Sequence, residues 1–244
     1  MEKRFWEIDF LRGIAVIMMI IFHFLFDLVF FRGYNINVSS GLLLYFARMT
    51  AFIFIFLVGV SLTISYSRAI KKQKTNLFTK YLKRGAKIFS WGLAITLVTW
   101  LFFREEFIIF GVLHFIGLSI ILAYPLIKYK WQNLVLGVFF IVAGFFLSKL
   151  TFNFSWLMWL GFIPKYFCTL DYFPLLPWFG VVLIGLFFGN LLYKNNRRIF
   201  KIADLSKNYL IIFFSFLGRH SLFVYLVHQP ALILMIRLAA MLLS

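Results

Sequence analysis

Seven long apolar stretches run through this chain, and they constrain its fold more than any other feature of the sequence. A helix needs about 20 apolar residues to cross the hydrocarbon core of a bilayer. Hydrophobic residues make up 63% of the chain, more than a soluble domain can bury. The sequence therefore predicts an all-α, polytopic membrane protein with seven to eight transmembrane helices. The expected spans are residues 9–31, 41–67, 84–103, 107–127, 131–150, 174–193 and 220–243.

Two shorter apolar pieces lie outside these spans. Residues 208–217 are expected to lie at the membrane interface as an amphipathic approach to the last span. Residues 152–165 are expected to form a re-entrant segment or an external hairpin. No linker or low-complexity tract interrupts the chain, so we expect a single domain over residues 1–244. The first span is too long and too charged for a signal peptide, which predicts that it is retained.

The formal net charge of +17 would suggest nucleic-acid binding in a soluble protein, but here the basic residues lie between the apolar stretches. With a cytoplasmic N-terminus, 17 Lys and Arg fall on the cytoplasmic side and four on the other. Cytoplasmic loops of membrane proteins carry this excess. We therefore expect a multi-pass cell-membrane protein with its N-terminus inside and no nucleic-acid partner.

The first span carries ionisable residues, which are costly in a membrane and therefore point to function. Arg12 and His23 are eleven residues apart, about three helical turns, so they share one face. His23 and Asp27 are four residues apart, a spacing that lets a carboxylate orient an imidazole. We predict His23 as a general base. Asp27 would orient it or form a structural ion pair with Arg48, which is otherwise a substrate-binding candidate.

The last span begins and continues with polar residues. Arg219 and His220 stand at its cytoplasmic start, and Ser221 can cap the helix. Guanidinium and helix N-terminal N–H groups favour phosphate, although ordinary basic flanking of a span explains the pattern as well. His228 and Gln229 lie deeper, and they are either substrate-binding or purely structural.

Three further candidates are expected on the outer side. His114, within the segment GVLHFIG, is a second candidate for proton transfer, or a structural histidine bonded to a carbonyl. Asp171 and Tyr172 open the segment DYFPLLPWFG, whose prolines and aromatic rings form a stiff mouth. We predict either that these two residues contact the acceptor or that the segment only anchors the protein at the membrane interface through its aromatic rings.

Cations that can bind phosphate lie at the inner face, namely Arg12, Arg219 and His220, and a histidine lies toward the outside. This arrangement suits a group transfer across the membrane. The donor must carry phosphates at one end and a reactive group on a long arm, which acyl-CoA does. We therefore expect acetyl-CoA as donor and a hydroxyl or amine of an external sugar, glycan or lipid headgroup as acceptor. The single Cys168 excludes a thiolate metal cluster, and no metal is expected. No ATPase, zincin or serine-hydrolase motif is present.

Four blocks spread along the chain resemble the heparan-α-glucosaminide N-acetyltransferase catalytic-domain family of transmembrane acyltransferases. They are Ile8–Asp27, Gly111–Gly117, Asp171–Gly180 and Leu217–Pro230. The interval from Asp9 to His23 is also similar to the first helix of acyltransferase-3 proteins, whose catalytic histidine His23 matches. The resemblance implies a helical membrane enzyme that passes an acetyl group from cytoplasmic CoA to an acceptor across the membrane.

One departure from the family limits what the resemblance implies. In the eukaryotic glucosaminide acetyltransferases, the position matching His23 is an asparagine, and the proposed catalytic histidine lies in the following external loop. Here that loop, residues 32–40, contains no histidine. The base would therefore be His23 or His114, and a heparan-like substrate is not carried over.

Two other classes of function remain open from the sequence. A transporter or channel also places polar groups at several depths of the membrane. A non-catalytic membrane scaffold would not need three ionisable groups on one helix. The sequence also leaves open whether the chain forms a homodimer.

Overall fold

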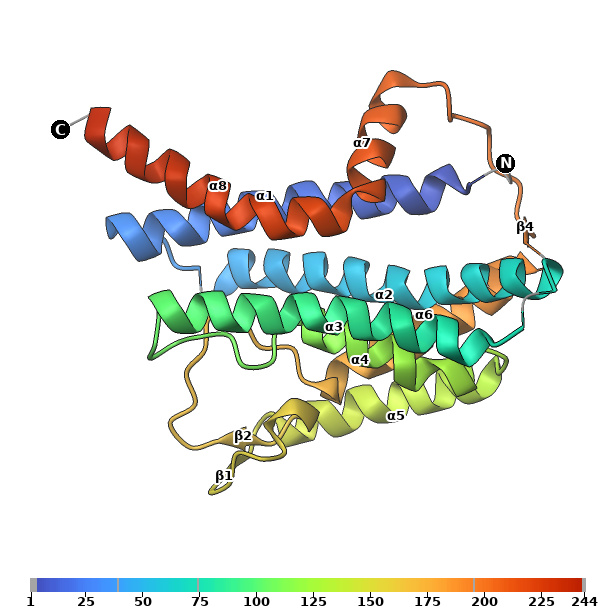
Figure 1. Ribbon diagram of the computed structural model, residues 1–244, viewed down its shortest axis with the longest axis horizontal. Coiled ribbons are helices and arrows are strands. Elements are labelled where there is room, and N and C mark those ends of the chain that lie inside the picture. Colours follow the sequence, from blue (N-terminus) through green and yellow to red (C-terminus); the bar gives the residue numbers. More distant parts are fainter. Residues whose placement is uncertain (1–3, 39, 74, 195, 243–244) are drawn as a thin grey trace. The chain divides into compact units, whose positions relative to one another are not determined.

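The computed structural model describes residues 4–38, 40–73, 75–194 and 196–242. Within these ranges the chain forms eight α-helices, and very short strands pair in two places (Figure 1). The helices are α1 (Trp6–Arg32), α2 (Gly41–Lys71), α3 (Leu77–Phe102), α4 (Val112–Ala123), α5 (Trp131–Leu147), α6 (Leu175–Leu192), α7 (Tyr209–Arg219) and α8 (Ser221–Leu242). The two-residue strands are β1 (Thr151–Phe152), β2 (Ile163–Pro164), β3 (Tyr193–Lys194) and β4 (Arg197–Arg198).

The predicted helical membrane protein is confirmed, but fewer helices than the expected seven to eight have the length of a span. Among the described residues, α1, α2, α3, α6 and α8 are long and apolar enough to cross a membrane. The predicted span 107–127 is shortened because α4 begins only at Val112 and gives way to a 3-10 turn at Tyr124–Leu126. Helix α5, with 17 residues, is also shorter than its predicted span.

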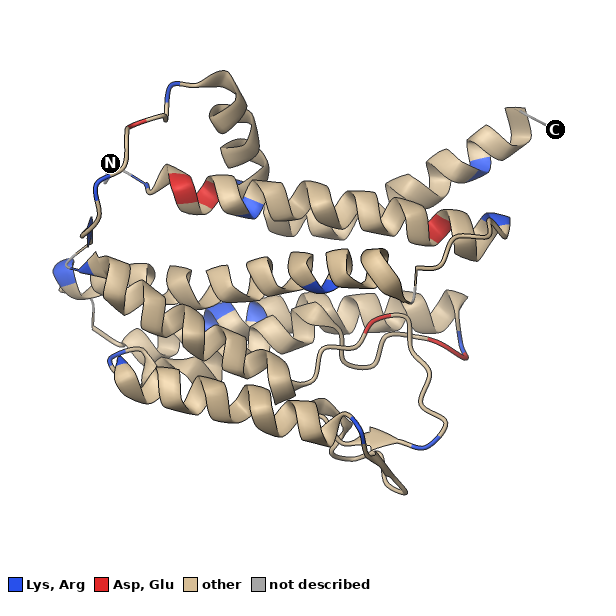
Figure 2. Ribbon diagram, turned by 180° about the vertical axis from the view of Figure 1, so that it is seen from behind, with Lys and Arg blue, Asp and Glu red and all other residues tan. Residues whose placement is uncertain are grey.

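Charged residues are restricted to the ends of α1, and a long uncharged stretch separates them (Figure 2). Elsewhere too, most Lys, Arg, Asp and Glu of the described residues lie at helix ends and in loops (Figure 2). This distribution is what a helix needs if its central turns face hydrocarbon.

Residues 4–54 and 202–242, where described, form one compact unit with α1, the start of α2, α7 and α8. Helix α7 crosses α1 steeply, and α8 runs alongside α1 (Figure 1). The crossing depends on two glycines: a Cβ on Gly13 would collide with the Phe214 carbonyl, and one on Gly218 with the Asp9 carbonyl. Close backbone approach at small residues is a typical way to pack membrane helices.

Helix α7 covers the predicted interfacial piece 208–217. Asn208 accepts a hydrogen bond from the Leu210 N–H and so caps the helix. Ile211 and Ser215 are buried against α1, whereas Phe213 and Phe216 are exposed. This two-sided character agrees with an amphipathic helix, and its place at the membrane interface stays a prediction.

Residues 55–201, where described, form a second compact unit. Helix α3 packs on α4 and α5 packs on α6, again through glycine pairs, Gly85 with Gly117 and Gly137 with Gly180. The segment expected as a re-entrant piece or hairpin, 152–165, holds β1, a 3-10 turn and β2, and these strands pair in parallel. The single domain over residues 1–244 stays a prediction.

Candidate functional site

Two histidines meet where α1 and α8 pack together. The rings of His23 and His228 are 4.9 Å apart, edge to face. His23 Nδ1 lies 2.9 Å from the Met19 carbonyl oxygen, and His228 Nδ1 lies 2.7 Å from that of Tyr225. A carbonyl only accepts hydrogen bonds, so each Nδ1 carries the proton and each neutral ring keeps a lone pair on Nε2.

A buried carboxylate and amide stand on the same two helices. Gln229 Nε2 donates to Asp27 Oδ1 at 2.6 Å, and Asp27 is fully buried. Among the described residues, the remaining Asp27 oxygen, the Gln229 amide oxygen and His228 Nε2 are buried without a hydrogen-bond partner. Buried polar atoms are normally paired, so three unpaired ones in one place are unusual. His23, Asp27, His228 and Gln229 are called the deep cluster below.

The predicted partners of Asp27 differ from those in the structure. Its carboxylate neither orients His23 nor pairs with Arg48 in the part of the chain that the structure describes. The imidazole is held by a carbonyl of its own helix, four residues back, and this local bond leaves nothing for a carboxylate to orient. Arg48 is exposed on α2, and its role stays a prediction.

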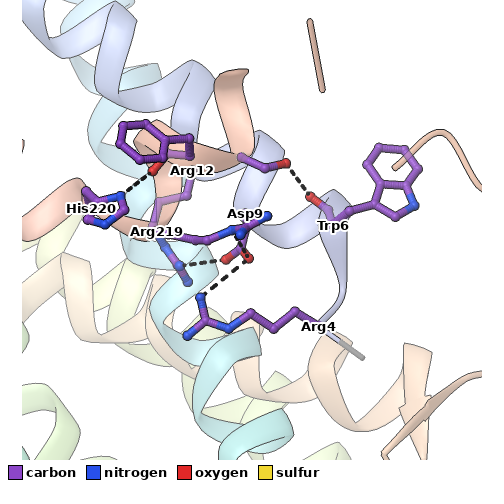
Figure 3. Close-up of polar contacts among 8 residues, drawn as sticks. Arg4, Trp6, Asp9, Arg12, Arg219 and His220 are labelled. Atoms are coloured by element: carbon purple, nitrogen blue, oxygen red, sulfur yellow. Dashed lines mark hydrogen bonds and ion pairs between the residues drawn. The ribbon is translucent and has the colours of Figure 1, made fainter. Parts of the chain in front are cut away.

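A second group of charges surrounds Asp9 at the start of α1 (Figure 3). Nitrogen atoms of Arg12, Arg219 and Arg4 lie 3.4, 3.6 and 4.0 Å from its carboxylate oxygens. These four residues are called the arginine cluster below. The sequence predicted that Arg12 and Arg219 act together, and the structure brings them together on Asp9. It missed Arg4, because a basic residue just before a span looks like ordinary flanking.

The other predicted phosphate ligands flank this cluster. His220 is exposed, and its Nδ1 lies 2.9 Å from the Phe216 carbonyl oxygen (Figure 3). Ser221 is the first residue of α8. Their contact with phosphate stays a prediction.

His114 has a different environment in the second unit. Its Nδ1 accepts the Gly111 N–H at 3.3 Å, as a glutamate does at this position of a capping box. Thr96 donates its hydroxyl proton to the Ile108 carbonyl at 2.6 Å, so His114 Nε2–H donates to that hydroxyl at 3.3 Å. Both ring nitrogens are therefore occupied, which favours a structural role. Proton transfer by His114 stays a prediction.

Asp171 and Tyr172 bind backbone groups of their own unit. Asp171 Oδ2 accepts the Val112 N–H at 3.0 Å, at the start of α4. Burial raises the pKa of this carboxyl to about 6, although the bonds from the backbone N–H groups oppose the shift. The Tyr172 hydroxyl donates to the Met158 carbonyl at 2.6 Å, and burial raises its pKa to about 12. Contact of either residue with an acceptor stays a prediction.

Among the residues that the structure describes, no group of three or more His, Cys, Asp or Glu is arranged to hold a metal ion. Cys168 is exposed in a loop, and its thiol lies 3.7 Å from Glu106.

The chain also matches a known protein family. The profile of the heparan-alpha-glucosaminide N-acetyltransferase catalytic family matches residues 4–230, and the chain belongs to this family. No curated protein and no solved structure matches the chain significantly. The matched range contains both the deep cluster and the arginine cluster. The family membership indicates a membrane acetyltransferase at the general level.

Proposed function

We propose that this member of the acetyltransferase family is a multi-pass cell-membrane enzyme. It moves an acetyl group from cytoplasmic acetyl-CoA to an amine or hydroxyl of a sugar, glycan or lipid headgroup on the other side. The observation that carries the proposal is the deep cluster, where two unprotonated imidazole nitrogens and a carboxylate oxygen meet inside an apolar helix pair. A membrane protein keeps such groups only where they are used.

His23 is the proposed general base. Its Nε2 takes the proton from the acceptor as the acceptor nitrogen or oxygen attacks the thioester carbonyl. The new bond to the acetyl carbon forms, the carbon–sulfur bond breaks, and CoA leaves as the thiolate. The Met19 carbonyl holds the Nδ1 proton, which keeps the reactive lone pair on Nε2 until Nε2 takes the proton. The Asp27 charge stabilises the imidazolium that forms.

The unpaired atoms of the deep cluster favour an amine over a hydroxyl as the acceptor. The Asp27 oxygen, the Gln229 oxygen and His228 Nε2 are all hydrogen-bond acceptors, and one of them is charged. An arriving ammonium group supplies several donors and a positive charge, whereas a hydroxyl supplies one donor. His228 and Gln229 are therefore proposed to bind the acceptor. The ammonium group gives its surplus proton to His228 before attack, so that His23 stays unprotonated and can act as the base.

The arginine cluster is the proposed site for the donor's phosphates. Arg12 and Arg219 meet there, with His220 and Ser221 beside them. Guanidinium groups bind phosphate oxygens in a planar, bidentate way. On α1, Arg12 and His23 are ~16 Å apart along the helix axis, so a donor that reaches both must be long.

The test measures CoA release by the detergent-purified chain with acetyl-CoA and a panel of amino sugars and their hydroxyl counterparts. Acceptor-dependent release that is faster with amines, and lost in His23→Gln but not in the control Arg32→Ala, supports the proposal. If His23→Gln folds and turns over like the wild type, the role of His23 is wrong. Uptake of a solute by proteoliposomes without thioester cleavage would favour a transporter instead.

A further inference from the structure

Asp9 occupies the centre of the arginine cluster, but the proposed transfer reaction gives it no role. Its side chain is only 10% exposed, and three guanidinium groups lie within 4.0 Å of its oxygens. Arg12 comes from α1 and Arg4 from the residues just before it, whereas Arg219 comes from the end of α7, more than 200 residues later (Figure 3). A buried carboxylate is costly, and one of these arginines would be enough to neutralise it.

The cluster therefore carries more positive charge than Asp9 needs. Three guanidinium groups and one carboxylate leave a surplus of two positive charges. Glu7, the other acid in the first turn of α1, is buried and has an interaction of its own, so this count applies to the four residues of the arginine cluster. A surplus of two charges matches a phosphate group that carries two negative charges.

The geometry leaves the guanidinium groups able to bind a further anion. The ion pairs of Arg219 and Arg4 with Asp9, at 3.6 and 4.0 Å, are longer than a tight charge-assisted hydrogen bond. The Arg219 and Arg4 side chains are 46% and 63% exposed, so both remain accessible to a ligand.

The backbone fixes where Arg219 enters the cluster. Its neighbour Gly218 lies so close to α1 that a Cβ would collide with the backbone carbonyl of Asp9 itself. Ser215, one turn earlier on α7, donates a weak hydrogen bond of 3.5 Å to the Trp6 carbonyl (Figure 3). The end of α7 is thus held on the first turns of α1, and the Asp9 carboxylate aligns the arginine that α7 delivers.

We propose that Asp9 is a positioning residue that gathers Arg4, Arg12 and Arg219 into one binding site for a phosphate group of the acyl-CoA donor. Arg4 becomes a third phosphate ligand of that site. The inference rests on the proposed function, because it takes acyl-CoA as the donor. The phosphate of an anionic lipid headgroup has the same chemistry, so the experiment must distinguish the two sources.

The experiment determines KM and kcat for acetyl-CoA and for acetyl-3′-dephospho-CoA with the full chain in phosphatidylcholine nanodiscs. Asp9→Asn keeps the shape of the side chain but removes its charge. If Asp9 positions the arginines, Asp9→Asn should raise KM for acetyl-CoA about tenfold, because about one charge-assisted contact is lost. The value of kcat should stay within about twofold. Arg4→Ala, which alters an exposed side chain, should raise KM about three- to tenfold. Arg32→Ala, at the other end of α1, is the matched control and should change neither constant.

A simple electrostatic attraction predicts the opposite result. Asp9→Asn makes the site more positive, so KM would fall if Asp9 only offset charge, and that result would overturn the proposal. An unchanged KM in Arg4→Ala would exclude Arg4 as a ligand. A smaller effect of Arg4→Ala with the dephospho donor assigns the site to the 3′-phosphate, and an equal effect assigns it to the diphosphate.

Two further arms separate the possible failures. If phosphatidylglycerol in the nanodiscs stabilises the wild type but not Arg4→Ala, and KM for acetyl-CoA is unaffected, the site binds lipid and the donor assignment is wrong. If the wild type neither binds nor cleaves acetyl-CoA, the proposed function itself fails. The thermal midpoint of each variant without ligand checks its fold. Should Asp9→Asn not fold, the Arg4→Ala result decides the proposal alone.

Discussion

The deep cluster and the surroundings of His114 both place histidine inside an apolar helical unit, but the hydrogen bonds of the ring nitrogens differ. His114 uses both, one to accept the Gly111 N–H and one to donate to Thr96. Among the residues that the structure describes, His23 and His228 each bond through Nδ1 alone, to a carbonyl of their own helix. A histidine whose bonding capacity is filled stabilises a fold, whereas one that keeps a lone pair can still take a proton.

The difference follows from the place of each histidine on its helix. His114 lies in the first turn of α4, where backbone N–H groups have no partner within the helix and a side chain can bind them. The residues of the deep cluster lie inside α1 and α8, where the backbone N–H groups are already bonded. Their side-chain acceptors find few donors within the protein. A donor-rich substrate would supply what the helices lack.

The largest expected effect comes from exchanging the two kinds of histidine for glutamine. His23→Gln should lower turnover about 10²- to 10⁴-fold, the usual contribution of a general base, and barely change the thermal midpoint. His114→Gln should instead destabilise the fold by about 1–3 kcal/mol, because a packed ring and its two hydrogen bonds are disturbed. Turnover per folded molecule should persist. Acetyl transfer and thermal unfolding in detergent measure both, and the reverse pattern would overturn the comparison.

The second prediction concerns Asp171, whose carboxyl has a pKa of about 6 because burial penalises its charged form. The folded state therefore holds its proton more tightly than the unfolded state, whose pKa is near 3.8. Stability should fall as the pH rises from about 4 to about 6, by on the order of 3 kcal/mol, and stay level above. Asp171→Asn keeps an acceptor for the Val112 N–H and should flatten this slope. Thermal midpoints between pH 4 and 8 test it, with Asp204→Asn, an exposed acid, as control.

Removing the charge of the deep cluster should have a smaller effect on catalysis than removing its base. Asp27→Asn keeps an oxygen for the Gln229 amide but loses the attraction for an ammonium group and for the imidazolium. Turnover with an amine acceptor should fall about tenfold, the cost of one charged interaction. The loss with a hydroxyl acceptor should be smaller. Equal losses with both acceptors would argue against binding of an ammonium group at Asp27.

The smallest effect is expected for Arg48. It is exposed on α2, and no ion pair with Asp27 exists among the described residues. Arg48→Ala should therefore change stability by less than about 0.5 kcal/mol, as is usual at surface positions. A thermal midpoint in detergent would show this. A large loss of acetyl transfer would instead support the prediction that Arg48 binds the substrate.

The sequence by itself determined the features that depend on local spacing. Apolar runs of span length predicted helices in a membrane, because each helix satisfies its own backbone groups there. The positions of Arg12, His23 and Asp27 placed candidate groups at the two ends of one helix, because 3.6 residues make a turn. The sequence also indicated the family, through four blocks spread along the chain. The number of spans was less predictable. The length of an apolar run does not reveal that α4 ends at Ala123 and gives way to a 3-10 turn at Tyr124–Leu126.

Only the tertiary structure decided which polar groups meet. The bond between Gln229 and Asp27 joins residues 202 positions apart, and Arg219 reaches Asp9 from the end of α7. The spacing had also suggested that Asp27 orients His23, but His23 bonds to the Met19 carbonyl of its own helix instead. Helical periodicity fixes the face of a residue but not the partner that packs against that face. Here the partner depends on where two backbones touch, at Gly13 and Gly218, because only residues without a Cβ let α7 lie directly on α1.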